Sequence, residues 1–181
     1  MKKRILIALV VVLALAATAS MVWAKGGGPT GPSGKSNVGH LYLREKDPAT
    51  WEIVEHGAWG KMKYKLSGPA FDFVFNGHEL NPGGDYTLIY YPDYDGGNPW
   101  PRVDIRCLAH GAANEEGNIH LAEAVELNSN LPMSYDYNTG AKIWLVESSA
   151  VECEPTNTMS GWNPTEYLFE YDLINYEDTD L

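Results

Sequence analysis

Oxygen-bearing side chains crowd the segment YYPDYDGGNPWP, residues 90–101, around two glycines. Asp93, Asp95 and Asn98 carry the carboxylate and amide oxygens that calcium prefers as ligands. Their spacing does not fit an EF-hand loop, because glycine comes too early and the twelfth position is Asp104 instead of glutamate. Asp, Gly and Asn are equally the residues of a chain reversal. We therefore interpret the segment as a turn, with a non-EF calcium site at Asp93, Asp95 and Asn98 as the alternative.

Tryptophans are the second group of residues with binding chemistry. Exposed flat rings stack against sugars and other ligands, whereas packed rings belong to a core. Trp144 lies inside the apolar run KIWLV, which predicts burial. Trp100 in NPWP and Trp162 in SGWNP lie in loop-like segments, so we predict that these two form the ligand-binding surface.

Catalytic chemistry has little support in the sequence. The segment NEEGN, residues 114–118, is typical of a hairpin turn, and a turn centred on Glu115 would place His110 opposite His120 as a transition-metal pair. Two unrelated surface histidines are the simpler interpretation. Motifs such as GxSxG, HExxH and the P-loop are absent from the sequence. We predict no enzymatic activity and keep a secreted hydrolase with paired carboxylates as an alternative.

The N-terminal residues predict export. Three cations precede a long apolar run in residues 1–24, which is the pattern of a signal peptide. The run is also long enough to remain as a membrane anchor if it is not cleaved. Residues 25–37 are rich in Gly, Pro and Ser and predict a flexible linker, and residues 38–181 fit one domain.

Charge and cysteine content agree with an extracellular location. Removal of residues 1–24 takes away three of the 13 Lys and Arg and none of the 24 Asp and Glu, so the net charge becomes 10 − 24 = −14. Such a chain repels nucleic acids and anionic membranes, so neither is an expected partner. Cys107 and Cys153 are the two cysteines, and in an oxidising compartment they predict a disulfide worth about 4 kcal/mol.

Periodicity predicts the fold class. Met62, Tyr64 and Leu66 alternate with lysines in KMKYKL, which is the period-two pattern of a half-buried strand. The same alternation occurs at residues 71–76 and in the C-terminal run TEYLFEYDLINY, and shorter strands are predicted near residues 41–44, 86–91, 103–109, 118–122 and 141–146. One or two helical turns are the alternative for residues 120–127. Many short strands separated by turn residues predict an antiparallel two-sheet Greek-key sandwich.

Two resemblances extend this prediction. LNPGGDY, Leu80 to Tyr86, resembles the tyrosine corner of fibronectin type III and immunoglobulin-like sandwiches, which implies that the Tyr86 hydroxyl bonds back to the preceding backbone. The blocks DPATWEIVEHGAWGKMKY, DFVFNGHELNPGGDYTLIYYPD, GAKIWLVESSAVECE and GWNPTEYLFEYDLI resemble an uncharacterised family of exported proteins in archaea and bacteria. That resemblance implies a sandwich and transfers no catalytic residue.

These observations predict an exported β-sandwich that works as a non-catalytic binding or assembly module. Its partner would be an extracellular protein or a glycan, contacted through Trp100, Trp162 and the loop at residues 93–98. A carbohydrate- or calcium-dependent binding module that uses the same loop is the first alternative, and a hydrolase is the second. No cofactor other than calcium is suggested.

Overall fold

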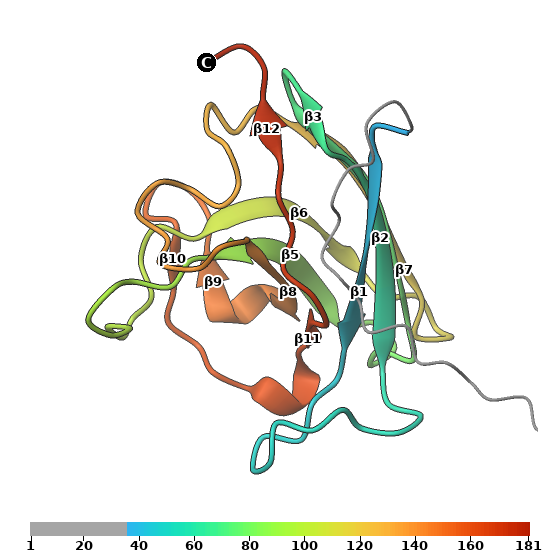
Figure 1. Cartoon of the computed structure of the whole chain (residues 1–181). Helices are drawn as coiled ribbons and strands as arrows, with labels where there is room; N and C mark the ends of the chain where they lie inside the picture. Colours follow the sequence, from blue (N-terminus) through green and yellow to red (C-terminus); the bar gives the residue numbers. More distant parts are fainter. Residues whose placement is uncertain (1–35) are drawn as a thin grey trace, which may run out of the picture.

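Residues 36–181 are described by the computed structural model of the chain, and their regular structure is almost entirely β-strand (Figure 1). The helical segments in this range are two single 3-10 turns, η1 (Ser148–Ala150) and η2 (Pro164–Glu166). The all-β prediction is therefore confirmed. The predicted signal peptide and all but the last two residues of the predicted linker lie outside the described residues.

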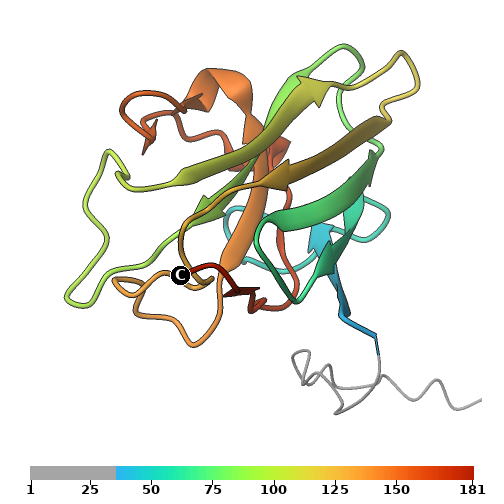
Figure 2. The ribbon, with the colours of Figure 1, turned by 90° about the horizontal axis from the view of Figure 1, so that it is seen from above.

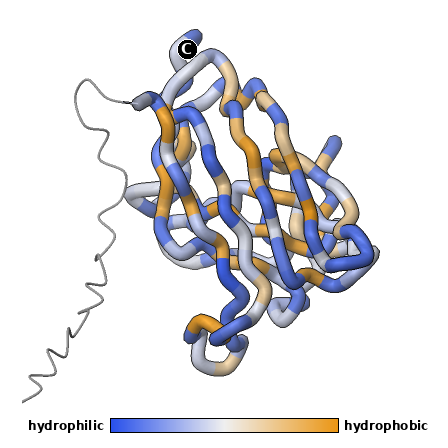
Figure 3. The backbone as a smooth tube through the Cα atoms, turned by 90° about the vertical axis from the view of Figure 1, so that its right-hand side faces the viewer, coloured by the Kyte–Doolittle hydropathy of each residue, from blue (hydrophilic) through white to orange (hydrophobic). Residues whose placement is uncertain are grey.

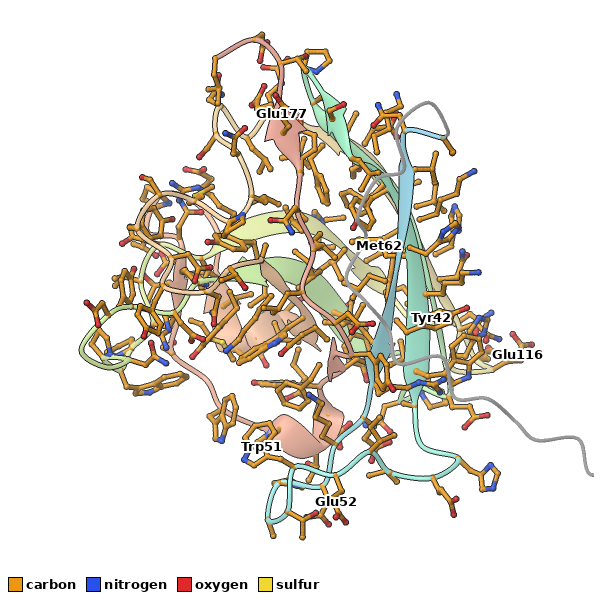
Figure 4. The ribbon with its side chains drawn as sticks, viewed as in Figure 1. Tyr42, Trp51, Glu52, Met62, Glu116 and Glu177 are labelled. Atoms are coloured by element: carbon orange, nitrogen blue, oxygen red, sulfur yellow. A yellow bond between two sulfur atoms is a disulfide. The ribbon has the colours of Figure 1, made fainter. Side chains whose placement is uncertain are left out.

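The larger sheet has five antiparallel strands in the order β11-β1-β2-β4-β7. These strands are β1 (Val38–Arg44), β2 (Trp59–Lys65), β4 (Phe71–His78), β7 (Ile119–Val125) and β11 (Phe169–Glu170). In β2 the buried residues alternate with exposed lysines, as the period-two pattern predicts. Met62 faces the interior and Tyr42 on β1 faces solvent (Figure 4).

The smaller main sheet has three antiparallel strands in the order β6-β5-β8. They are β5 (Asp85–Tyr91), β6 (Arg106–Ala112) and β8 (Lys142–Glu147). Two short pairs complete the structure: β9 (Val151–Glu152) with β10 (Thr158–Met159), and β3 (Ser67–Gly68) with β12 (Glu177–Asp178). The central strand β5 is buried on both of its faces.

The two main sheets face each other across a shared hydrophobic core (Figure 2). Phe73 and Phe75 of β4 belong to the same cluster as Leu88 and Tyr90 of β5. Figure 3 shows hydrophobic residues interspersed with hydrophilic ones along the strands, as expected for strands with one buried face. Two antiparallel sheets with a common core are consistent with a β-sandwich.

A second core covers the other face of the three-stranded sheet. Ile89, Trp144 and Val146 of β5 and β8 pack there against Tyr167 and Phe169. The C-terminal part of the chain therefore wraps over the smaller sheet, which explains why β5 has no solvent-exposed face. This second core lies beneath the candidate site described below.

Two local predictions are confirmed by hydrogen bonds and covalent geometry. Cys107 on β6 and Cys153 after β9 form a disulfide, which fastens the covering segment to the smaller sheet. The Tyr86 hydroxyl accepts a hydrogen bond from the Asn81 N–H at 3.2 Å, as the tyrosine-corner resemblance implies.

One sequence-based prediction and two of the alternatives differ from the structure, while the strand predicted near residues 118–122 is present as β7. The turn at 114–118 does not close a hairpin, because β6 belongs to the smaller sheet and β7 pairs with β4 in the larger one. His110 pairs with Thr87 and His120 with Asn76, so the two histidines are not cross-strand partners. Helical turns at residues 120–127 are replaced by β7, since pairing with β4 outweighs local helix propensity.

The C-terminal run is less regular than its alternation suggests. It forms only the two-residue β11 and isolated bridges, and Tyr171, which the alternation places on the apolar side with Tyr167 and Phe169, is 48% exposed. Its backbone bonds are divided among several strands, including Leu145↔Leu168 and Ala141↔Ile174. The pattern is therefore interrupted each time the chain changes partner.

Candidate functional site

Three half-exposed tryptophans from three separate loops meet on the surface. Trp51 lies between β1 and β2 (Figure 4), Trp100 between β5 and β6, and Trp162 between β10 and η2. Their exposed fractions are 50%, 50% and 47%. The ring centroid of Trp162 lies 6.2 Å from that of Trp51 and 6.2 Å from that of Trp100. We call Trp51, Trp100 and Trp162 the tryptophan platform.

A layer of buried aromatic rings supports the platform. Phe169 contacts Trp51 edge to face at 5.2 Å, and Trp144 lies 6.2 Å from Trp162. Trp144 in turn stacks on Tyr91 with centroids 3.8 Å apart. Aromatic pairs of this kind add about 0.5–1.5 kcal/mol each beyond the area that they bury. The exposed rings therefore rest on a packed base.

A tight turn holds Trp51 in place. The Asp47 carboxylate accepts hydrogen bonds from the N–H groups of Ala49 and Thr50, and these bonds lower the pKa of Asp47. The Trp51 N–H then donates to the Asp47 carbonyl at 2.7 Å, and Trp51 adopts a φ of 60°. A bulky residue in the left-handed region is strained, and such strain persists only where surrounding contacts impose it. Here the contacts with Phe169 and Trp162 do so.

Arg102 anchors the loop that carries Trp100. Its backbone exchanges hydrogen bonds with Met159 at 2.9 and 2.7 Å. Its guanidinium is buried, donates to the Tyr91 hydroxyl at 2.9 Å, and lies 4.6 Å from the centroid of the Tyr91 ring. A second ring, that of Tyr94, lies 5.4 Å away. These aromatic faces stabilise the buried cation by cation–π interaction.

The segment that carries Trp162 is positioned by a close backbone approach. Gly161 donates its N–H to the Ala150 carbonyl at 3.0 Å, and a Cβ at Gly161 would lie 2.7 Å from the Ala150 Cα. Only glycine fits this contact without a backbone shift. On the other side, the Tyr167 hydroxyl accepts from the Asn163 N–H at 3.0 Å. The residues on both sides of Trp162 are thus held in place by hydrogen bonds.

The platform borders a surface depression of about 450 Å³ lined by Tyr91, Trp100 and Trp162. This volume falls within the range typical of small-molecule sites. Trp100 and Trp162 meet at an interplanar angle of 79°, so their rings form a corner instead of a flat wall. A ring-shaped ligand could stack on one indole and touch the edge of the other.

Asp93 is the centre of a polar network beside the Trp100 loop. Its carboxylate accepts hydrogen bonds from Asn98 at 3.0 Å and Asn138 at 2.8 Å and forms an ion pair with Lys142. Partial burial raises the pKa of the Asp93 carboxyl, but the Lys142, Asn138 and Asn98 donors outweigh burial and hold the pKa below its ordinary value. Asp93 therefore remains a carboxylate that protein donors satisfy.

Of the predicted calcium ligands, Asp93 and Asn98 are in contact, but Asn98 is there the hydrogen-bond donor to the Asp93 carboxylate. Asp93 pairs with Lys142, the Asn98 side-chain oxygen accepts from the Tyr94 N–H at 3.1 Å, and Asp95 is exposed. Calcium would have to displace the Lys142 ammonium from Asp93, so the residues do not fit the ion as they are arranged. Within residues 36–181, no three His, Cys, Asp or Glu side chains are grouped as a metal site.

A second cavity, of about 240 Å³, contains carboxylates. Glu45, Glu79 and Glu166 contribute to its lining beside the tyrosine corner. Burial raises the pKa of Glu166, and the charges of Glu147 and Glu45 add to this effect. Glu45 accepts from the Ala58 N–H at 2.8 Å and Glu166 accepts from the Asn81 side chain, so both have structural partners. Its three carboxylates make this cavity a candidate location for the hydrolase alternative.

Sequence reasoning found two members of the platform and missed the third. Trp100 and Trp162 are brought together as a pair, and Trp51 joins them from a loop distant in sequence. The available signal was the polar, turn-rich context DPATW, which places a large ring in a loop. Tyr91 and Arg102 were also missed, since their roles depend on contacts between segments.

Comparison of the chain with protein-family models, with curated protein sequences and with solved structures found no match. The resemblance to exported archaeal and bacterial proteins therefore stays a prediction. Among residues 36–181, no helix has the length and apolar character needed to cross a bilayer.

Proposed function

We propose that this chain is an exported, non-catalytic binding module whose tryptophan platform stacks against the sugar rings of a polysaccharide. The observation that carries this proposal is the contact of Trp162 with both Trp51 and Trp100, three indoles that each remain about half exposed. Large aromatic rings are normally buried, and a contiguous exposed group of them marks an interaction surface.

The arrangement of the rings favours a sugar over a flat protein partner. Pyranose rings present an apolar C–H face that stacks on an indole and a rim of hydroxyls that stays hydrated. The corner between Trp100 and Trp162 offers one stacking face and one edge, and Trp51 continues the surface beyond Trp162. One sugar would occupy the corner, and the next would extend over Trp51.

Rigidity supports the same function. Trp51 is held in a strained turn, and Trp162 is pinned by Gly161 and Tyr167. A preorganised surface loses little conformational entropy on binding, which raises affinity for a ligand that makes few hydrogen bonds.

The finer fold and the location belong to the same proposal. A Greek-key path is supported by β7, which returns to pair with β4 after β5 and β6 have entered the other sheet. The hydrogen bond between Asn81 and Tyr86 supports an immunoglobulin or fibronectin type III-like corner. The disulfide supports an oxidising, extracellular location.

The direct test is binding of the full chain to insoluble polysaccharides such as cellulose, chitin and xylan. Trp162→Ala and Trp100→Ala should each weaken binding at least roughly tenfold, as loss of a buried aromatic contact does. Tyr137→Ala is the matched control, because Tyr137 is 70% exposed and lies outside the platform. Equal binding by Trp162→Ala and the parent chain would refute the proposal.

A secreted hydrolase is the remaining alternative from another class. The carboxylate cavity with Glu45, Glu79 and Glu166 is the specific observation behind it. Release of reducing sugar by the full chain, abolished in Glu166→Gln, would establish this alternative. Binding without product release is the result that the non-catalytic proposal expects.

A further inference from the structure

The outer face of the five-stranded sheet differs in charge from the rest of the molecule. Of the 13 Lys and Arg, five precede residue 36, which leaves eight against all 24 Asp and Glu in the described residues. Four of these eight point outward from this face: Arg44 of β1 and Lys61, Lys63 and Lys65 of β2. Half of the Lys and Arg in residues 36–181 are therefore gathered on one surface.

The cross-strand register leaves these cations almost without acidic neighbours. Lys61 lies beside Tyr42 and Asn76, and Lys63 lies beside His40 and Val74. Asp72 is the single acid that β1, β2, β4 and β7 direct outward, and it pairs with Lys65 at 2.6 Å. Lys61 and Lys63 thus have no recorded ion pair within the described part of the chain.

Aromatic side chains hold two of the cations in position. The Arg44 guanidinium lies 5.9 Å from the Tyr42 ring and 5.6 Å from the Trp59 ring. The Lys61 ammonium lies 5.4 Å from the Tyr42 ring. Cation–π contacts at such exposed sites contribute about 0.5–1 kcal/mol each and keep the charges over the sheet.

A cavity of about 390 Å³ lies where the row of cations ends. Tyr42, Arg44, Ile53 and Tyr171 contribute to its lining, together with the carboxylate-bearing Glu55. Tyr42, Ile53 and Tyr171 are all more than one third exposed, so the cavity is an accessible apolar surface beside a guanidinium. Such a cavity suits a sugar ring that carries a carboxylate.

We propose that this face binds a linear acidic polysaccharide, a chain of sugar rings with carboxylate groups. One ring occupies the Tyr42–Arg44–Tyr171 cavity with its carboxylate on Arg44, and later carboxylates lie along Lys61 and Lys63. Outward residues two apart on a strand are roughly 7 Å from each other, so β2 presents its charges in a regular line. This surface shares no residue with the tryptophan platform.

Charge density favours a polyuronate over a nucleic acid. Duplex DNA carries one charge per roughly 1.7 Å of axis, which an acidic protein repels strongly. A polyuronate carries at most one charge per sugar. At physiological salt the screening length is about 8 Å, so the cations of the face act locally while acids elsewhere are largely screened.

Fluorescence anisotropy of a labelled oligogalacturonate with the full chain tests this proposal. Binding should be measurable at about 50 mM NaCl and weaken at about 200 mM, because ion pairs with a polyanion are lost with salt. A neutral maltooligosaccharide of equal length should not compete. The double variant Lys61→Gln/Lys63→Gln should weaken binding roughly fivefold to tenfold, as expected for two exposed ion pairs.

The matched control compares single variants: Lys63→Gln should weaken binding, whereas Arg106→Gln, which removes one charge from β6 in the other sheet, should leave affinity within about twofold. Tyr171→Ala should weaken binding without any change of charge. Equal losses of affinity in Lys63→Gln and Arg106→Gln would show that only net charge matters and would overturn the proposal. The proposal would also be overturned if the parent chain self-associated in ultracentrifugation and the lysine variant did not, because a second copy of the chain would then occupy the face. Binding to phosphatidylglycerol vesicles alone, without binding to the oligogalacturonate, would overturn it as well.

Discussion

Trp162 meets Trp100 edge to face, with ring centroids 6.2 Å apart and planes at 79°. The two rings come from segments that the backbone hydrogen bonds between Arg102 and Met159 join, and Trp144 and Tyr91 stack beneath them in the second hydrophobic core. Their corner therefore depends on the covering segment that the disulfide attaches to β6. The predictions below test this dependence.

The shared corner predicts energetic coupling between Trp100 and Trp162. If both rings contact one sugar, their alanine substitutions should be non-additive by about 1 kcal/mol in polysaccharide binding. Trp51→Ala combined with Trp100→Ala should be closer to additive, because each contacts Trp162 and no contact between them is recorded. Titration calorimetry of the single and double variants measures both cycles. Additivity in the first cycle would mean that the corner does not hold a single ring.

Removal of the disulfide should destabilise the chain. Cys107→Ser/Cys153→Ser opens a loop with a sequence separation of 46 and should lower the free energy of unfolding by about 2–4 kcal/mol. Denaturant titration gives this value, and reduction of the parent chain should reproduce it. An unchanged midpoint in both experiments would contradict the structural role of the bond.

Gly161→Ala should displace the segment that carries Trp162. The new Cβ would lie 2.7 Å from the Ala150 Cα, which is backbone and cannot move aside cheaply. We expect a loss of about 1–3 kcal/mol in stability together with weaker polysaccharide binding. Gly68→Ala is the control, since its nearest neighbour would be at 3.5 Å, an ordinary contact. Equal melting temperatures for the two variants would show that the close approach of Gly161 to Ala150 does not restrict the side chain at position 161.

Asp93→Asn should remove the ion pair with Lys142 and the carboxylate that lies 3.9 Å from the buried Arg102 guanidinium. We expect the free energy of unfolding to fall by about 3 kcal/mol. The pKa of Asp93 is lowered in the fold. Its contribution is therefore present above the unfolded pKa and is lost as pH falls through the lower folded value. Denaturation curves at several pH values should therefore show the two proteins converging as pH falls below the ordinary carboxyl pKa towards the lowered pKa of Asp93.

Asp95→Asn provides the matched control for that experiment. Asp95 is exposed on the same loop, so its substitution should change stability by less than about 0.5 kcal/mol at any pH. A comparable loss in both variants would indicate a general effect of loop charge instead of the network around Asp93.

Calcium should not raise the melting temperature. Lys142 and Asn138 already satisfy Asp93, and Asn98 is used by Tyr94, so the ligand set is not free. Thermal melts with and without millimolar calcium measure this, because a ligand well above its dissociation constant must stabilise the fold. A clear increase in melting temperature with calcium that is absent in Asp95→Asn would support a calcium site instead.

Local patterns were sufficient to predict much of the fold. The alternation of Met62 and Tyr64 with lysines requires a strand with one buried face, since adjacent side chains of a strand point to opposite sides. Two cysteines allow a single intramolecular pairing, and the Tyr86 corner uses residues close in sequence. Each of these features depends on short-range geometry that a sequence displays directly.

Only the tertiary structure decided which sheets the turn at 114–118 connects and which tryptophans are in contact. The same turn residues can join strands of one sheet or of two, and the choice depends on burying β7 against β4. Trp51, Trp100 and Trp162 converge because three loops pack on one aromatic base. The sequence by itself determined the strands and the disulfide, since these follow from local periodicity and residue count. The proposed binding surfaces arise from contacts between distant segments, whose geometry no local pattern specifies.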